Sequence, residues 1–207
     1  MENTLNEAIM IAHDELLEDR ETASAAARAR LGRREIVQKT DAFLVHVCRH
    51  VSAMCDVILP AVRTQLPDGK ERVHEYVQQC RRLERAASVT KRRLYGDSRT
   101  IALSWTEVWN DLSQEFDRLD AVDQRLIADL SGVLCDSSRL SLASRLDAAE
   151  RSGPTRPHPN SAHTGRFAHR VLGMWARADR FWDATEGRIV SRRRPKVAAP
   201  ARESEAG

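Results

Sequence analysis

The segment LVHVCRHVSAMCDVILP, residues 44–60, combines residue types that bind metals. His46 and His50 lie four residues apart, with Cys48 between them and Cys55 after them. Imidazole nitrogens and thiolates are ligands that zinc, copper and iron accept. The segment is therefore either part of a metal site or a helix core that contains histidine.

Helical geometry separates these four side chains. At about 100° per residue, an apolar stripe is formed by Val47, Val51, Met54 and Ile58. His50 lies roughly 60° from the centre of this stripe and His46 about 100°. We therefore expect His50 to point into the protein and His46 to lie at a seam between helices. Cys48 and Cys55 fall on the opposite flank, so a His/Cys zinc site on this helix alone is not expected.

Two other histidines could join His50. His13 precedes the apolar pair Leu16–Leu17 of a first predicted helix, and His74 stands at the core edge of a third. The candidate metal ligands are therefore His13, His50 and His74. The fourth predicted helix contains no histidine, and we expect its inward face to be a hydrocarbon wall with Asp123 as the nearest carboxylate. The favoured interpretation is histidines satisfied at helix seams and four cysteines packed separately, because buried thiols behave as small hydrophobes.

The elements that must position these residues are all predicted to be helices. Apolar residues recur at helical spacing over 4–32, from Asp41 to about 66, over 70–94, from Ser104 to about 130, over 137–151 and over 165–187. Pro60 should kink the second helix, and Ser104 with Glu107 forms a capping-box pattern. Four amphipathic helices with short turns can bury their stripes only against one another, which predicts an all-α, up-down four-helix bundle.

The chain is predicted to divide into four parts. Residues 1–152 form the bundle, 153–164 a Pro-rich extended strap, 165–190 an amphipathic helix packed on the bundle, and 191–207 a disordered basic tail. The net charge is only +3 and the four cysteines form no CxxC pair, which suits free thiols in a reducing cytoplasm. No signal peptide is apparent, and no run approaches the roughly 20 apolar residues of a membrane span.

The predicted helix over 165–187 carries a candidate interaction surface. Trp175 and Trp182 lie seven residues apart, interleaved with Arg170, Arg177 and Arg180. Aromatic residues at this spacing usually belong to a core, but they could form a dimer interface or lie on a membrane surface. The basic tail could add weak binding to nucleic acid or anionic lipid. Specific nucleic-acid recognition is not expected, and the partner is either an unknown protein or a second copy of the chain.

Several motifs resemble one protein family. They are PTRPHPNSAHTGRFAHR with ADRFWDATEGR, RHVSAMCDVILPAVRTQLPDG, RRLERAAS, RRLYGD and SWTEVWNDL. Together they resemble the actinobacterial hemerythrin-like (HHE cation-binding) proteins over about residues 20–188. The resemblance implies a four-helix bundle that binds non-haem di-iron, with O₂, nitric oxide or redox sensing as its role.

The metal-ligand pattern departs from that family. His50 matches a ligand in the HxxxE motif, but the fourth residue after it is Met54. Where related proteins carry histidines, this chain has Ser88 and Val89, then Leu119 and Val122. These residues are poor ligands for iron. The resemblance therefore implies a non-catalytic sensor or binding module with a degenerate di-iron site and no cofactor.

Two alternatives remain open, and neither is an enzyme. In the first, the protein binds iron for O₂, nitric oxide or redox sensing through an atypical ligand set that includes His13, His50 and His74. In the second, it is a membrane- or nucleic-acid-associated adaptor that uses the Arg/Trp helix and tail. The sequence contains no Gly-rich phosphate loop, nucleophile elbow or Ser/His/Asp arrangement that would indicate catalysis.

Overall fold

The computed structural model describes residues 5–29, 31–96, 102–158 and 168–185, and it confirms the all-α class. Within those ranges no strand occurs. The elements in chain order are α1 (Leu5–Arg28), α2 (Arg33–Ala53), the π-helical turn η1 (Met54–Ile58), α3 (Leu59–Gln65), α4 (Gly69–Tyr95), α5 (Trp105–Val133), α6 (Asp136–Ser152) and α7 (Ala168–Thr185).

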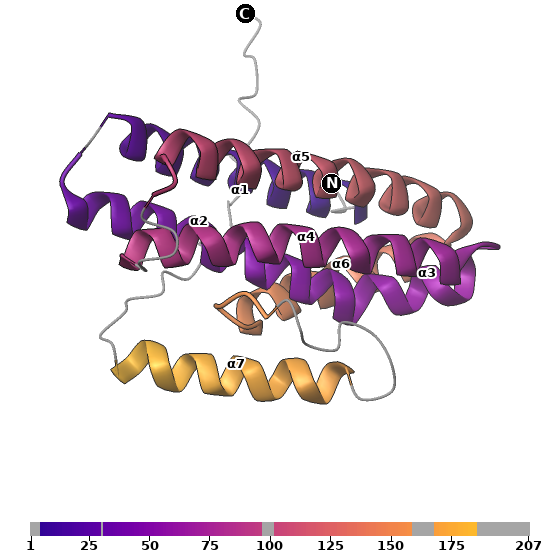
Figure 1. Cartoon of the computed structure of the whole chain (residues 1–207). Coiled ribbons are helices and arrows are strands. Elements are labelled where there is room, and N and C mark those ends of the chain that lie inside the picture. Colours follow the sequence, from indigo (N-terminus) through magenta and orange to yellow (C-terminus); the bar gives the residue numbers. More distant parts are fainter. Residues whose placement is uncertain (1–4, 30, 97–101, 159–167, 186–207) are drawn as a thin grey trace, which may run out of the picture.

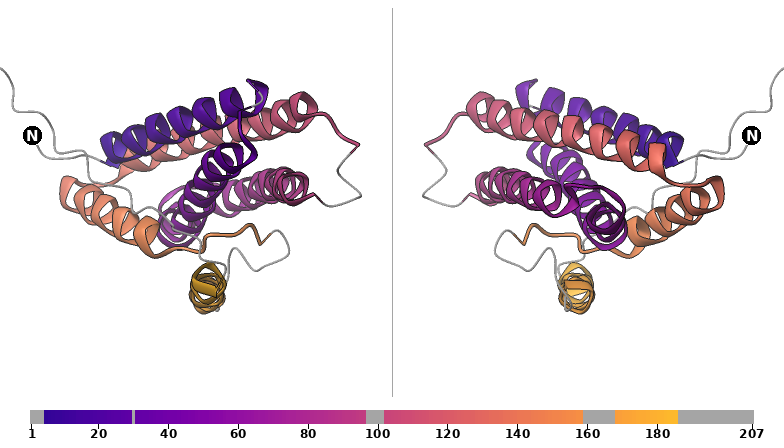
Figure 2. Two further views of the ribbon diagram at one scale, coloured as in Figure 1. Left: turned by 90° about the vertical axis from the view of Figure 1, so that its left-hand side faces the viewer. Right: turned by 90° about the vertical axis from the view of Figure 1, so that its right-hand side faces the viewer.

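The long helices pack side by side around one apolar core. α1 lies against α2 and α5, and α4 lies against α5 and α2. Figure 1 shows α1 and α5 as an upper layer above α2 and α4, and Figure 2 shows α6 closing one side. The core contains Val47 and Met54 of the predicted stripe, together with Ile9, Leu112 and Leu126 of the neighbouring helices. Each helix therefore buries its apolar face against its neighbours, as the periodicity predicts.

The first turn between helices differs from its predicted position. α1 ends at Arg28, and Gly32 is the N-cap residue of α2, which begins at Arg33 and not at Asp41. The stretch before Asp41 is rich in charge and suggests a connection. It is helical because Ile36 packs against the core and Thr40 is fully buried.

Pro60 changes the helix one turn before itself. A proline has no N–H to donate to the carbonyl four residues earlier, and over Met54–Ile58 the chain adopts a π-helical turn. The N–H of Leu59 donates to the carbonyl of Met54, five residues earlier. The predicted disturbance is therefore present as a π-bulge. Such turns often lie near functional sites, and this one directly follows the helix that carries His50.

Local sequence signals set several helix ends. The capping box is confirmed: the Glu107 N–H donates to Ser104 Oγ at 3.1 Å and the Ser104 N–H donates to Glu107 Oε2 at 2.8 Å. Gly96 ends α4 at φ 81°, in the left-handed region that favours glycine. At Gly69 a Cβ would lie 2.2 Å from the Val62 carbonyl oxygen, so only glycine fits the turn between α3 and α4.

α7 lies below the other helices in Figures 1 and 2. Residues 153–158 are non-helical, as the prolines predict, and α7 falls within the predicted helix 165–190. The rest of the predicted strap and helix, and the predicted tail 191–207, lie outside the described residues. Leu172 joins α7 to the core.

Among the described helices, one continuous stretch is long and apolar enough to span a membrane by composition alone. It is Arg33–Gln65, and 78% of its apolar window is buried within the protein. A core helix has the same composition, and here the apolar side chains are covered by neighbouring helices.

Candidate metal centre

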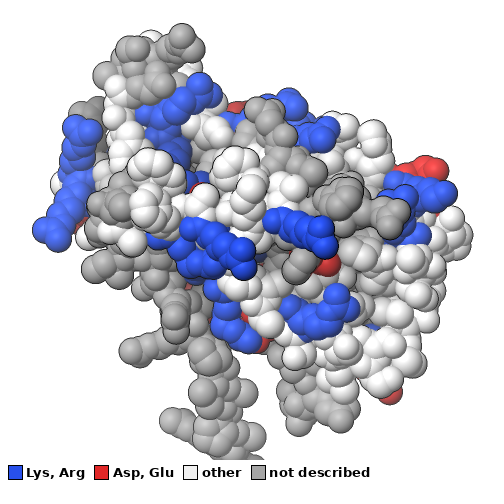
Figure 3. Space-filling model, turned by 90° about the horizontal axis from the view of Figure 1, so that it is seen from below, with Lys and Arg blue, Asp and Glu red and all other residues white. Residues whose placement is uncertain are grey.

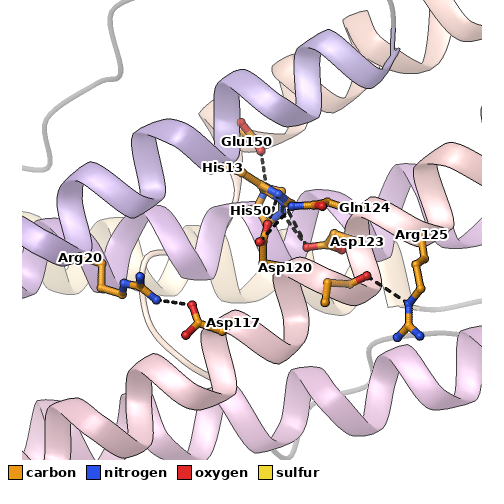
Figure 4. A network of polar contacts seen from close by, with 10 residues as sticks. His13, Arg20, His50, Asp117, Asp120, Asp123, Gln124, Arg125 and Glu150 are labelled. Carbon is orange, nitrogen blue, oxygen red and sulfur yellow. Dashed lines mark hydrogen bonds and ion pairs between the residues drawn. The ribbon is translucent and has the colours of Figure 1, made fainter.

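Three potential ligands from three helices meet in the interior. His13 comes from α1, His50 from α2 and Asp123 from α5, and their donor atoms all lie within 4.8 Å of one another. All three are buried, with exposures of 4%, 2% and 1%. Figure 4 shows the two imidazoles and the carboxylate turned toward one another.

The three donor atoms form a nearly equilateral triangle. The Nε2 atoms of His13 and His50 lie 3.3 Å apart. Asp123 Oδ2 lies 3.4 Å from His13 Nε2 and 3.2 Å from His50 Nε2. Ligands about 2.1 Å from a metal are separated by about 3.0 Å in octahedral and about 3.4 Å in tetrahedral geometry. The edges of the triangle, 3.2–3.4 Å, fall within this range, so these three atoms could hold one ion together.

The outer nitrogen of each histidine faces a further carboxylate. His13 Nδ1 forms an ion pair with Asp120 Oδ1, and His50 Nδ1 lies 2.7 Å from Glu150 Oε1 on α6. Gln124 donates to Asp120 Oδ2 at 3.0 Å and so orients the first of these carboxylates. Metal-bound histidines usually donate their second N–H to a carboxylate in this way, which fixes the ring and its tautomer.

These outer contacts determine what the inner nitrogens can do. A carboxylate only accepts hydrogen bonds, so Nδ1 of both His13 and His50 must carry a proton. In the neutral imidazole Nε2 then has a lone pair, and the two lone pairs face each other and Asp123 Oδ2. Three acceptors that point at one another need either protons or a cation between them.

The shifts in the pKa values of His50, His13 and Asp123 agree with a requirement for positive charge between these acceptors. Burial opposes a charge on His50, but its contacts with Asp123 and Glu150 outweigh burial and raise its pKa to about 10. Burial likewise opposes protonation of His13, yet contacts with Asp120 and Asp123 raise its pKa. Burial would raise the pKa of Asp123, whereas the two histidines lower it. The cluster thus attracts positive charge.

The charge of the cluster can be balanced in two ways. Three carboxylates surround two imidazoles, so neutral histidines leave three negative charges, one buried on Asp123 and two half-buried on Asp120 and Glu150. Buried charge is costly unless it is paired. Two protons or one divalent cation supply the same positive charge, and metal binding would then release the protons.

Two fully buried side chains of α4 extend the site. Burial raises the pKa of the Tyr76 hydroxyl well above its usual value, and the nearby Asp123 carboxylate adds to this effect. Burial and the neighbouring Cys55 thiol raise the pKa of Cys80 in the same way. Both groups therefore stay protonated and uncharged beside the cluster.

The structure corrects the prediction of a hydrocarbon wall on the fourth helix. Asp123 on this helix is buried and converges with His13 and His50, so the prediction that the inward face is hydrocarbon is wrong at this position. The spacing of Asp123 from the core leucines of the same helix is the sequence signal that indicates its inward position. Asp123 stands between Leu119 and Leu126, four residues after one core leucine and three before the next. A carboxylate at a core position of an amphipathic helix marks a buried polar site.

The other predicted residues are placed as follows. His74 is exposed on α4 and does not join the cluster. His46 lies at the seam of α1 and α2, as expected, with Nδ1 2.5 Å from Asp19 Oδ2. The prediction of four separately packed thiols is wrong for three of them. Cys48, Cys55 and Cys80 are buried, but Cys55 and Cys80 are neighbours, and Cys135 is exposed before α6.

The predicted interaction surface is divided between two sides of α7. Trp175 stacks on His158, with ring centroids 4.2 Å apart, so it belongs to the contact between strap and helix. Trp182 is 54% exposed, and Arg170, Arg177 and Arg180 are exposed as well.

No family model, curated protein or solved structure matches the chain.

Proposed function

We propose that this protein is a non-catalytic metal-binding module in which His13, His50 and Asp123 hold one non-haem metal ion. The observation that carries this proposal is the triangle of donor atoms with edges of 3.2–3.4 Å. Asp120 and Glu150 then act as positioning residues, because each faces the outer nitrogen of a ligand histidine.

Iron is the metal that this donor set suits best. Two histidines and one carboxylate on one face of an ion, with the remaining positions open, are typical of non-haem iron(II) sites. The burial of all three residues restricts any further ligand to a small molecule. Bound iron would supply reversible binding of O₂ or nitric oxide, or a change of oxidation state, which agrees with the sensing role implied by the resemblance.

The proposed scaffold is a hemerythrin-like, up-down four-helix bundle made by α1, α2, α4 and α5. The order of helix contacts and the positions of His13 and His50 support it. Three inward donor atoms are too few for two ions, and Met54 follows His50 where the family motif has a carboxylate. We therefore propose that the di-iron site is degenerate and has kept a single metal position.

A metal titration of the full chain tests this function. We expect binding of one iron(II) ion per chain under anaerobic conditions, measured by metal analysis after gel filtration and by calorimetry. His50→Gln should abolish binding, because the amide cannot replace the imidazole Nε2. His74→Gln is the matched control and should bind as the wild type does, since His74 is exposed and outside the cluster.

The competing interpretation is a buried network of histidines and carboxylates that holds protons only. It requires that iron(II), zinc and manganese(II) all fail to bind in stoichiometric amounts. Binding of zinc but not iron would keep the metal site and reject the sensing role.

A further inference from the structure

The outward side of α7 exposes three large apolar side chains. Met174, Phe181 and Trp182 are 55%, 64% and 54% exposed, and the rings of the last two pack edge to face with centroids 5.8 Å apart. Isolated exposed apolar residues are common on protein surfaces. Three large ones on a single helix of 18 residues are a feature that calls for a partner.

Arginines alternate with these apolar residues. Arg170, Met174, Arg177 and Phe181 follow one another at steps of four, three and four residues, so they form one line along the helix. Arg180 is exposed beside this line. The outward side therefore combines apolar anchors with guanidinium groups.

The two acidic residues of the described helix lie on its other side. Asp179 and Asp183 are buried, with exposures of 2% and 5%. Asp179 Oδ2 accepts from the N–H groups of Thr155 and Arg156 at 2.8 and 3.0 Å, and Asp183 Oδ2 accepts from Thr155 Oγ1 at 2.6 Å. The strap thus covers both carboxylates, and within Arg170–Ala184 the exposed charges are all positive.

The same sign of charge extends over this side of the molecule. Figure 3 views the protein from below, the side on which α7 lies, and shows Lys and Arg spread over the face with few acidic groups. Such a surface is complementary to an anionic partner.

We propose that α7 binds the surface of an anionic lipid membrane and lies parallel to it. Phe181, Trp182 and Met174 would enter the interfacial region, while the arginines contact lipid phosphates and carboxylates. Amphipathic helices with basic residues and Trp or Phe bind membranes in this manner. A nucleic acid would use the arginines but leave the apolar line in water, so lipid explains both features. This proposal does not depend on the metal site.

Vesicle co-sedimentation of the full chain tests the proposal. The probes are vesicles of phosphatidylcholine alone and of phosphatidylcholine mixed with phosphatidylserine, each at low and high salt. We expect binding only to the anionic vesicles, with weakening at high salt because surface charges are screened. The triple variant Arg170→Gln, Arg177→Gln, Arg180→Gln should bind about a hundredfold more weakly.

Matched variants separate the helix from general surface properties. Phe181→Ser with Trp182→Ser should weaken binding by at least about tenfold, whereas Met10→Ser with Val133→Ser removes two equally exposed apolar side chains from α1 and α5 and should have no effect. Replacing Arg85, Arg92 and Arg125 by Gln is the charge control and should also leave binding unchanged. All these residues are exposed, so helix content by circular dichroism should stay constant.

Other outcomes would overturn the proposal. Equal binding to neutral and anionic vesicles, or equal loss in the control variants, would remove the role of α7. Loss of a dimer in the Phe181/Trp182 variant without loss of vesicle binding would identify a second copy as the occupant. Binding of duplex DNA through the same arginines, with no vesicle binding, would identify nucleic acid.

Discussion

Two buried groups of carboxylates and histidines in this protein resemble each other in composition but differ in their hydrogen bonding. One is built on Asp123 in the interior of the long helices. The other is built on Asp179, between the strap and α7. Both contain an aspartate that is at most 2% exposed and an imidazole nitrogen 3.2 Å from it.

The Asp179 group supplies its own donors. Two backbone N–H groups and His158 converge on Asp179 Oδ2, and Asp183 receives the Thr155 hydroxyl and the Arg156 guanidinium. Backbone N–H groups and arginine donate at every ordinary pH. The hydrogen bonds of this group are therefore satisfied without a ligand. We call Thr155, Arg156, His158, Asp179 and Asp183 the clasp, because their contacts hold α7 against the strap.

The Asp123 group has one such fixed donor, the protonated Tyr76 hydroxyl beside Asp123. Each histidine uses Nδ1 on an outer carboxylate, and the Nε2 atoms that face Asp123 Oδ2 donate only when the imidazoles carry a second proton. Buried polar residues alone therefore do not make a site. A site arises where converging acceptors outnumber the fixed donors, because a cation or a proton is then needed.

The largest expected effect is that of Asp123→Asn on metal binding. The amide removes the negative charge and one ligand atom while keeping the shape of the side chain. We expect iron(II) affinity to fall by at least about a hundredfold, measured by competition with a chelator. Asp179→Asn is the comparison variant, and we expect it to bind iron as the wild type does. Equal affinity of the Asp123 variant and the wild type would contradict the assignment.

The apo and metal-loaded forms should differ in the sign of their pH dependence. The pKa of His50 is raised to about 10 in the folded protein, above about 6.5 when unfolded. Its stabilising contribution is therefore complete below about pH 6.5 and is lost as pH rises toward 10, on the order of 5 kcal/mol in all. Metal binding needs neutral imidazoles, so metal affinity should instead rise with pH.

Unfolding in denaturant at several pH values, with a chelator and with excess metal, measures both slopes. In His50→Gln the apo slope between pH 6.5 and 10 should become much smaller. An apo slope that is unchanged in this variant would show that another group controls it.

The outer carboxylate Glu150 should have a smaller effect. In Glu150→Gln a neutral amide replaces the carboxylate that accepts the hydrogen bond from His50 Nδ1. The weaker hydrogen bond orients the imidazole ring less well. We expect metal affinity to fall by about 10–100-fold, with one ion per chain still bound at saturation. Glu75→Gln, at an exposed position of α4, is the control. An effect as large as that of Asp123→Asn would make Glu150 a direct ligand.

The smallest effect is expected in the clasp. Thr155→Val removes the hydroxyl that donates to Asp183 at 2.6 Å and keeps the size of the side chain. We expect a loss of about 1–3 kcal/mol in the local stability of α7, because a buried carboxylate loses a partner. Amide hydrogen exchange of α7 measures this loss, while iron affinity should stay constant. A loss of iron affinity would show that the two groups are coupled.

The sequence by itself predicted the all-helical class and most helix positions. Apolar spacing and the Ser104–Glu107 capping box are local signals, and each acts through neighbouring residues in the chain. The start of α2 at Arg33 was missed, because the burial of Ile36 and Thr40 depends on other helices. The inward direction of His50 also followed from its position on the helix.

Only the tertiary structure decided which side chains meet His50. His13 lies 37 residues before it, Asp123 73 residues after it and Glu150 100 residues after it. A helical period fixes the direction of a side chain but not its height along the neighbouring helix. That height depends on how the helices pack, and the packing places His13 and Asp123 opposite His50 and leaves His74 exposed on α4.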